Sequence, residues 1–330
     1  MALAFRRGSG MGRAMKRILG PLAVIGRYGT QGFVVSLLVG LSLPWLAAAA
    51  RPLLGITVFV FLLTSFMRLE GRAFLAVLRS PRLLVLTVLC TLLVPGIVVL
   101  VVKAVAGPDL IDPGLALGLA IYAAAPPIMS SPAVAMLLGI EPALILATVL
   151  ITTLASPILS PTIADLVAGG VVPLDLTILI TRLVGLVGGA LVTGIALRRV
   201  LGAAWIGENG RSLDGIGVLM YGLFAIAAMD GVLAALVSRP TRVAGFLGLS
   251  VLLSLAGYGI AWLVLRRVPA AQRIVLGYAT GQRNMGLIVA ALGASAPETT
   301  FLFFALAQFP IYIGPQVIKI LARRILPPMR

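Results

Sequence analysis

The sequence predicts an all-α membrane protein of ten transmembrane helices, arranged as two inverted repeats of five helices each. Of its 330 residues, 60% are hydrophobic and only 11% are charged, and the mean hydropathy is +1.13. A water-soluble domain of this size could not cover its surface with so few polar side chains. The apolar residues fall into runs long enough to cross a bilayer, and two of these runs, five spans apart, are interrupted by Pro or Gly.

Ten runs of about twenty apolar residues follow one another along the chain, separated by Pro, Gly or charged residues. In order they are residues 31–50, 52–69, 81–102, 113–138, 142–167, 176–197, 216–237, 242–265, 272–292 and 299–320. They leave short loops and no room for a soluble domain. We therefore expect a first repeat over residues 31–167 and a second over residues 168–330. Because five is an odd number of spans, the second repeat would lie inverted relative to the first.

Residues 1–30 form a basic segment that contains no acidic residue. A targeting peptide is one interpretation, but no small-residue cleavage site follows a proper apolar core. The pattern favours the alternative, a cytoplasmic segment that lies on the inner leaflet.

The distribution of basic residues predicts the orientation in the membrane. If the N-terminus is cytoplasmic, most of the Lys and Arg behind the net charge of +16 lie in inner loops and at the termini. The outer loops then hold only Arg51, Lys103, Arg239 and Arg242. This asymmetry follows the positive-inside rule for an even number of spans. We expect both termini in the cytoplasm and a location in a plasma membrane of the bacterial inner-membrane type.

The composition argues against several classes of function. The chain has no His, one Cys and ten acidic residues that are scattered along the sequence, so no group has the spacing of metal ligands. No Ser/His/Asp or Cys/His set is evident, and we expect neither enzyme activity nor a cofactor. The basic residues lie between the apolar runs, where they orient a membrane protein, so nucleic acid is not an expected partner.

Two of the expected spans contain residues that disfavour a continuous helix. The fourth includes "AAPPIMSSPAVAMLLG", in which three prolines flank Ser130 and Ser131, and the ninth includes "GYATGQRNMG", in which three glycines flank Gln282, Arg283 and Asn284. Interrupted helices at matching positions of inverted repeats are typical of the binding site of a secondary transporter. Their helix N-termini would offer partial positive charge and free N–H groups to an anion, while exposed carbonyls and hydroxyls could hold a cation. The alternative is a pair of kinked helices packed in a core.

Two segments together resemble the bile acid:sodium symporter family: "APPIMSSPAVAMLLGIEPALILATVLITTLASPILSPTIAD", which begins at residue 125, and "TGQRNMGLIVAAL", which begins at residue 280. The resemblance implies ten helices in a panel domain and a core domain, with helices 4 and 9 unwound and crossing at their centres. It also implies symport of organic anions, usually with sodium.

The resemblance assigns binding roles to residues of the first repeat. The Ser-Asn pair of the family at the helix-4 interruption falls on Ser130 and Ser131, so the hydroxyl is kept and the amide is lost. A threonine that helps to bind sodium falls on Thr148, but its serine partner one turn earlier falls on Leu144.

The second motif departs from the family pattern. The pattern Glu-x-Gly-x-Gln-Asn falls on residues 279–284, where Gly281 and Asn284 match but Ala279 and Arg283 replace the glutamate and the glutamine. Sodium prefers charged oxygen ligands, and a nearby guanidinium would repel it by about 4 kcal/mol at ~4 Å and an effective dielectric constant of about 20. The sequence therefore argues against sodium coupling, although the resemblance implies it.

Our hypothesis is that the Arg283 guanidinium occupies the place of a bound cation and offers a bidentate fork to an anionic substrate. An Arg within the membrane costs ~2.5 kcal/mol or more and is by default a functional-site candidate. The alternative is a structural role, in which the guanidinium pairs with helix-4 carbonyls or with an acid such as Asp230.

Asp230 is the one acidic residue clearly inside an expected span. Three interpretations remain open: it carries a proton, it neutralises Arg283, or it lies near the outer interface and is solvated. The first would make the chain a proton-coupled exchanger. A further alternative, of another class, is a membrane sensor that binds a ligand without transporting it.

Overall fold

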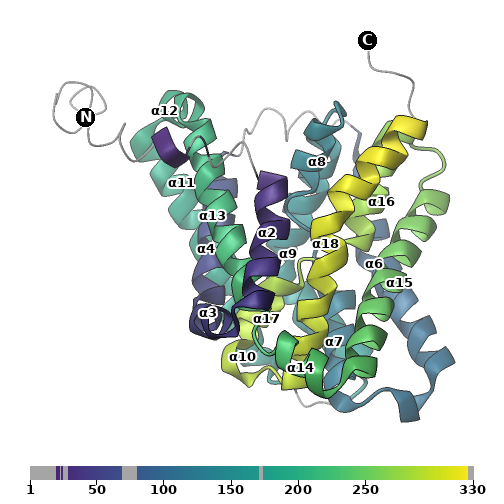
Figure 1. Ribbon diagram of the computed structural model, residues 1–330. Coiled ribbons are helices and arrows are strands. Elements are labelled where there is room, and N and C mark those ends of the chain that lie inside the picture. Colours follow the sequence, from purple (N-terminus) through teal and green to yellow (C-terminus); the bar gives the residue numbers. More distant parts are fainter. Residues whose placement is uncertain (1–19, 23, 25–28, 69–79, 171–173, 326–330) are drawn as a thin grey trace. The chain divides into compact units, whose positions relative to one another are not determined.

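The computed structural model describes residues 20–22, 24, 29–68, 80–170 and 174–325 (Figure 1). These residues are almost entirely helical, and they include no β-strand beyond one isolated bridge. Seven of the described helices are long and apolar enough to cross a membrane: Pro44–Met67, Pro81–Ala106, Ala143–Ala168, Leu176–Leu201, Gly210–Ser238, Pro240–Val264 and Glu298–Ile325. The chain is therefore an all-α, multi-pass membrane protein.

The first, second, fourth and ninth expected spans differ from the prediction. The fourth and ninth are each split into two shorter helices. The first and second were expected over residues 31–50 and 52–69, but the boundary lies earlier, at Leu43, because Pro44 begins a new helix there. Arg51 and Pro52 then lie inside a 3-10 turn that carries this helix onward to Met67. The number of ten spans and the inverted repeats stay predictions, and most of the segment 1–30 lies outside the described residues.

The chain divides into two compact units, each assembled from two stretches of sequence. Unit 1 comprises Met1–Leu69 and Val184–Leu233, and unit 2 comprises Glu70–Leu183 and Ala234–Arg330. Each unit draws on both halves of the sequence, so this division is different in kind from the predicted repeats.

Unit 1 is a small helical bundle. Its described elements are α2 (Gly29–Ser42), α3 (Pro44–Ala50), η3 (Arg51–Leu53), α4 (Leu54–Met67), the π-helical turn η5 (Val184–Gly188), α11 (Gly189–Leu201), α12 (Ala203–Glu208), α13 (Gly210–Ala228) and the start of α14 (Val232–Ser238). Helix α13 packs on α2 and α4, and α11 packs on α4. The backbones approach closely at Gly40, where an added Cβ would lie 2.8 Å from the Ile226 backbone.

Unit 2 contains both split helices. Its described elements are α6 (Pro81–Ala106), η4 (Pro108–Leu110), α7 (Pro113–Ala124), α8 (Ser131–Leu137), α9 (Ala143–Ala168), α10 (Leu176–Leu183), the rest of α14, α15 (Pro240–Val264), α16 (Ala270–Gly281), α17 (Met285–Leu292), η6 (Gly293–Ser295) and α18 (Glu298–Ile325). Helices α6, α9 and α18 all pack on α7, and α15 packs on α6, α16 and α18. Almost every residue of α7 is buried, so this helix lies at the centre of the unit.

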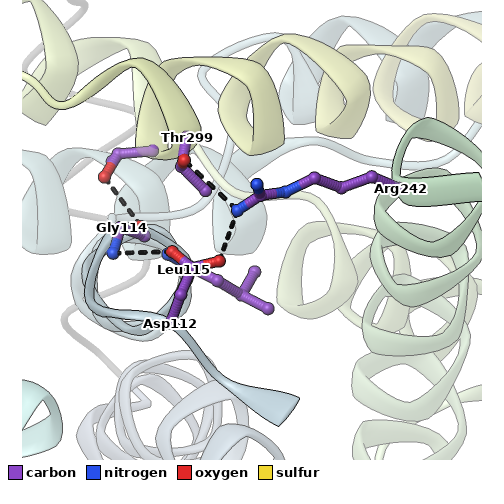
Figure 2. A network of polar contacts seen from close by, with 6 residues as sticks. Asp112, Gly114, Leu115, Arg242 and Thr299 are labelled. Atoms are coloured by element: carbon purple, nitrogen blue, oxygen red, sulfur yellow. Dashed lines mark hydrogen bonds and ion pairs between the residues drawn. The ribbon is translucent and has the colours of Figure 1, made fainter. Parts of the chain in front are cut away.

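A polar network fixes the start of α7 (Figure 2). Asp112 caps the helix, since its Oδ1 accepts hydrogen bonds from the backbone N–H groups of Gly114 and Leu115 at 3.0 and 3.1 Å. Arg242, near the start of α15, forms an ion pair with Asp112 Oδ2, and its Nη2 also lies 3.3 Å from Thr299 Oγ1 in α18. The network therefore ties the first turns of three helices together.

Candidate functional site

Each of the two split helices of unit 2 is interrupted where the sequence predicts. Helix α7 ends at Ala124 and α8 begins at Ser131, because two consecutive prolines, Pro126 and Pro127, lack the backbone N–H groups that a helix needs. Helix α16 ends at Gly281 and α17 begins at Met285, with Gln282 in an extended conformation.

The two interruptions pair with each other through their backbones. The N–H of Ile128 donates to the carbonyl oxygen of Gln282 at 3.0 Å, and the N–H of Asn284 donates to the carbonyl oxygen of Pro126 at 2.8 Å. These bonds form an antiparallel bridge centred on Pro127 and Arg283. Non-helical backbone at membrane depth must find its hydrogen bonds inside the protein. Here each interrupted segment supplies one backbone donor and one backbone acceptor to the other.

The side chain of Arg283 is enclosed at this bridge. Only 1% of its surface is exposed. Its Nη1 donates to the carbonyl oxygen of Thr91 in α6 at 2.7 Å, and its Nη2 donates to the carbonyl oxygen of Ala125 at the end of α7. Among the described residues, no carboxylate pairs with it, and Nε has no hydrogen-bond partner. The hydrogen bonds that the structure gives this guanidinium therefore both go to backbone carbonyl oxygens.

Both acceptors of Arg283 are carbonyl oxygens that their own helices leave without a donor. Pro95 stands inside α6, four residues after Thr91, and it lacks the N–H that would normally reach the Thr91 oxygen. Ala125 follows the last residue of α7. A buried carbonyl without a hydrogen-bond donor is costly. The guanidinium supplies the missing donor to both carbonyl oxygens.

Other side chains of unit 2 serve unpaired carbonyls in the same way. Ser156 Oγ donates to the Thr153 oxygen at 2.6 Å, which lies four residues before Pro157. Tyr278 Oη lies 3.5 Å from the Ile311 oxygen, four residues before Pro315.

Two hydroxyl groups do the same for carbonyls at the ends of the split helices. Tyr122 Oη donates to the Gly281 oxygen and Ser160 Oγ to the Ala124 oxygen, each at 2.8 Å. Hydroxyl groups of side chains thus donate hydrogen bonds to carbonyl oxygens at both interruptions.

Close packing leaves no room for a side chain at Gly281. A Cβ added there would lie 2.3 Å from the carbonyl oxygen of Ser254 in α15. The neighbouring helices also approach at Gly257, where an added Cβ would lie 3.0 Å from the Gly281 Cα. Contact between two backbones therefore holds the end of α16 in place.

The structure brings five of the predicted site residues to the paired interruptions. Ser130 and Asn284 immediately precede α8 and α17 and are partly exposed. Ser131 is buried, and its Oγ donates to the Ile128 oxygen at 2.8 Å. Gln282 is 7% exposed, and its Oε1 has no hydrogen-bond partner among the described residues. Arg283 completes the group.

The other two predicted residues have different neighbours. Thr148, fully buried in α9, lies with its Oγ1 2.9 Å from that of Thr87 in α6 and also donates to the Leu144 oxygen. Asp230 belongs to unit 1, where its Oδ2 accepts a hydrogen bond from Arg51 Nη1 at 2.8 Å. The carboxylate that the sequence offered as a partner for Arg283 thus forms an ion pair with Arg51.

The prediction that Arg283 could pair with helix-4 carbonyls is confirmed for Ala125. Sequence reasoning did not identify Thr91 or Tyr122 as contributors to the site. A signal was present for one of them, because Pro95 in a long apolar run implies an unpaired carbonyl at Thr91. In the part of the chain that the structure describes, no group of three His, Cys, Asp or Glu side chains could hold a metal ion.

The comparisons with known proteins add no assignment to this geometry. A scan of the sequence against protein-family models found no match, and a search of curated proteins found none either.

Proposed function

We propose that the chain is a secondary transporter that moves a small organic anion across the membrane by alternating access. One observation carries the proposal: two interrupted helices pair inside an apolar, multi-pass protein, with the guanidinium of Arg283 enclosed at their bridge. Interrupted helices are the usual binding element of secondary transporters.

The sign of the charge favours an anionic substrate. An arginine side chain is positively charged at physiological pH, and no described carboxylate pairs with that of Arg283. In surroundings of low dielectric constant, its field reaches further than it would in water. Ser130 and Asn284, which are partly exposed beside it, offer polar groups that a carboxylate or sulfonate could contact. In this proposal Arg283 attracts the substrate, and its neighbours contact it directly.

The same geometry favours transport that does not need sodium. Carbonyl oxygens are suitable ligands for hard cations, and the oxygens of Thr91 and Ala125 already accept hydrogen bonds from the guanidinium. We propose that Arg283 stands permanently where related carriers would bind a coupling cation. The chain would then be a divergent member of the bile acid:sodium symporter family, with ten spans in two inverted repeats and both termini in the cytoplasm.

Uptake into proteoliposomes tests this proposal. The purified protein is reconstituted and offered a panel of radiolabelled carboxylates and sulfonates, in sodium or potassium buffer of equal ionic strength. We expect uptake of at least one anion above that of empty vesicles, at the same initial rate in both buffers.

Three results would contradict parts of the proposal. Uptake that requires sodium would refute the role of Arg283 as a cation substitute. Uptake that a pH gradient drives would favour the proton-coupled alternative. Binding of an anion, seen as thermal stabilisation, without any uptake would indicate a sensor.

A further inference from the structure

Helices α15 and α18 of unit 2 run side by side in the same direction. Near their starts, Arg242 Nη2 lies 3.3 Å from Thr299 Oγ1, a pair separated by 57 positions in the sequence. One turn further on, the rings of Phe246 and Phe303 pack edge to face at 5.8 Å, with the same offset. Two contacts therefore fix the register of the two helices.

This register brings two pairs of arginines to the same depth. Because each residue adds 1.5 Å along a helix, residues with the same offset lie level with one another. Continued along the two helices, this register places Arg266 and Arg267, which lie two and three residues beyond the end of α15, near the depth of Arg323 and Arg324 in the last turn of α18. All four side chains are exposed, and both helices end in the upper part of Figure 1. We refer to these four residues as the arginine rim.

No acidic residue lies near the arginine rim on its own helices. Between Gly231 and Arg330, the sequence contains a single acid, Glu298, at the opposite end of α18. Among the described residues, none of the four arginines takes part in an ion pair. No carboxylate on α15 or at this end of α18 therefore offsets their charges.

The surface that leads to the rim is apolar. On α15, Leu252, Leu255 and Leu263 are 55%, 62% and 70% exposed. On α18, Val317 and Ile320 are 46% and 58% exposed. In a membrane protein, exposed apolar side chains along a helix contact lipid acyl chains. Arginines at the ends of such helices lie at the level of the lipid headgroups.

An aromatic residue marks the same level. Trp262, in the last turn of α15, carries the guanidinium of Arg273 3.9 Å above its ring, and Arg273 Nη2 donates to the Trp262 carbonyl oxygen at 2.6 Å. Tryptophan is enriched at the membrane–water interface. Its position supports the placement of the rim at this interface.

We propose that the arginine rim binds the headgroup of an anionic phospholipid, whose acyl chains lie along the exposed apolar rows of α15 and α18. A guanidinium binds phosphate through two parallel hydrogen bonds, so arginine pairs suit this ligand better than lysines would. Anionic headgroups also attract basic residues at the membrane surface through their field. This inference does not depend on the transport proposal.

Thermal unfolding of the purified full-length protein in neutral detergent tests the inference. We expect phosphatidylglycerol to raise the Tm in a saturable manner and phosphatidylcholine of the same chain length to leave it unchanged. Replacing Arg266 and Arg267 with Gln should weaken the apparent affinity for phosphatidylglycerol ~25-fold, and Arg323→Gln with Arg324→Gln should do the same. The control is Arg239→Gln, an exposed arginine that precedes α15 at its other end, which should change the affinity less than twofold.

A further variant keeps the positive charges and removes only the planar guanidinium groups. Replacing all four arginines with Lys should preserve the preference for phosphatidylglycerol with a reduced affinity, even if the Gln variants do not fold. Equal stabilisation by the two lipids would overturn the proposal, as would full affinity in both Gln variants. Inorganic phosphate that stabilises the protein as well as phosphatidylglycerol does would indicate a site for a soluble anion and would also overturn it.

Discussion

Arg283 supplies the hydrogen bond that Pro95 removes from α6. Its Nη1 lies 2.7 Å from the Thr91 carbonyl oxygen, which stands four residues before that proline and has no donor in its own helix. The two residues are far apart in the sequence, and each introduces an unpaired polar group whose energetic cost the other lowers. A buried guanidinium needs acceptors, and a buried carbonyl needs a donor.

This relationship predicts a coupling between the two positions in unfolding experiments. Arg283→Met leaves two buried carbonyls without donors and should lower the free energy of unfolding by about 2 kcal/mol. In a Pro95→Ala background the loss should be about 1 kcal/mol smaller, because the new N–H of residue 95 can serve the Thr91 oxygen. Reversible unfolding in mixed micelles measures both values.

A second proline in a helix of unit 2 supplies the control for this cycle. Pro157 also frees a carbonyl, but Ser156 serves it. The effects of Pro157→Ala and Arg283→Met should therefore add to within about 0.5 kcal/mol. Equal coupling in both cycles would show that Arg283 does not act through Pro95.

The charge of Arg283 should affect uptake, and its shape should affect stability. Arg283→Gln removes the charge and should reduce the apparent affinity for the transported anion by about tenfold or more, which corresponds to ~1.4 kcal/mol. Arg283→Lys keeps the charge but cannot serve the Thr91 and Ala125 oxygens together, so it should mainly lower stability. Initial uptake rates at several anion concentrations give the affinities. Equal affinity in the wild type and the Gln variant would remove Arg283 from the transport mechanism.

The approach of α15 to α16 makes Gly281 intolerant of a side chain. In Gly281→Ala, the new Cβ would lie 2.3 Å from the Ser254 oxygen, and because both groups belong to backbone, one helix must move. We expect a loss of about 1–3 kcal/mol in the free energy of unfolding. Gly248→Ala, in α15, is the matched control, because nothing lies within 4 Å of the added Cβ there. It should leave the Tm unchanged or raise it slightly.

The ion pair between Arg51 and Asp230 allows a test of the proton-coupled alternative. Both side chains are partly exposed, so Asp230→Asn should lower the free energy of unfolding by no more than about 1 kcal/mol. If Asp230 has no part in coupling, uptake by the variant should respond to an imposed pH gradient as the wild type does. A response that disappears in Asp230→Asn would establish the carboxylate as a proton carrier.

The helical class and the two interruptions could be predicted because they depend on local chemistry. Length and hydropathy identify helices that cross a membrane, and a proline in such a helix removes a hydrogen bond wherever the chain folds. Pro126, Pro127 and Gly281 therefore predict breaks at the places where the structure has them. The predicted boundary at Arg51 was wrong because the charge of Arg51 was taken as the end of a span, whereas the new helix starts earlier, at Pro44.

The partners of the site residues could not be predicted in the same way, because they depend on tertiary packing. The sequence identified Arg283 as a charge within the membrane and offered two structural partners, helix-4 carbonyls and Asp230, of which the structure shows a helix-4 carbonyl, that of Ala125. The choice depends on which helices lie against α16, and the contribution of α6 through Thr91 has no local signal beyond Pro95. The position of Thr148 opposite Thr87 is likewise visible only when α9 and α6 are packed together.

The hydrogen bonds of Arg283 also bear on the biosynthesis of the protein. Its two acceptors, in Thr91 and Ala125, precede it by 192 and 158 residues, so the ribosome has delivered both to the translocon long before Arg283 itself emerges. A guanidinium that entered bare lipid would be strongly disfavoured, but here its acceptors are already present in the bilayer. Late insertion of the segment that carries Arg283 is thus assisted by helices that were inserted early, and a chain that lacks α6 would have difficulty in retaining α16 and α17 in the membrane.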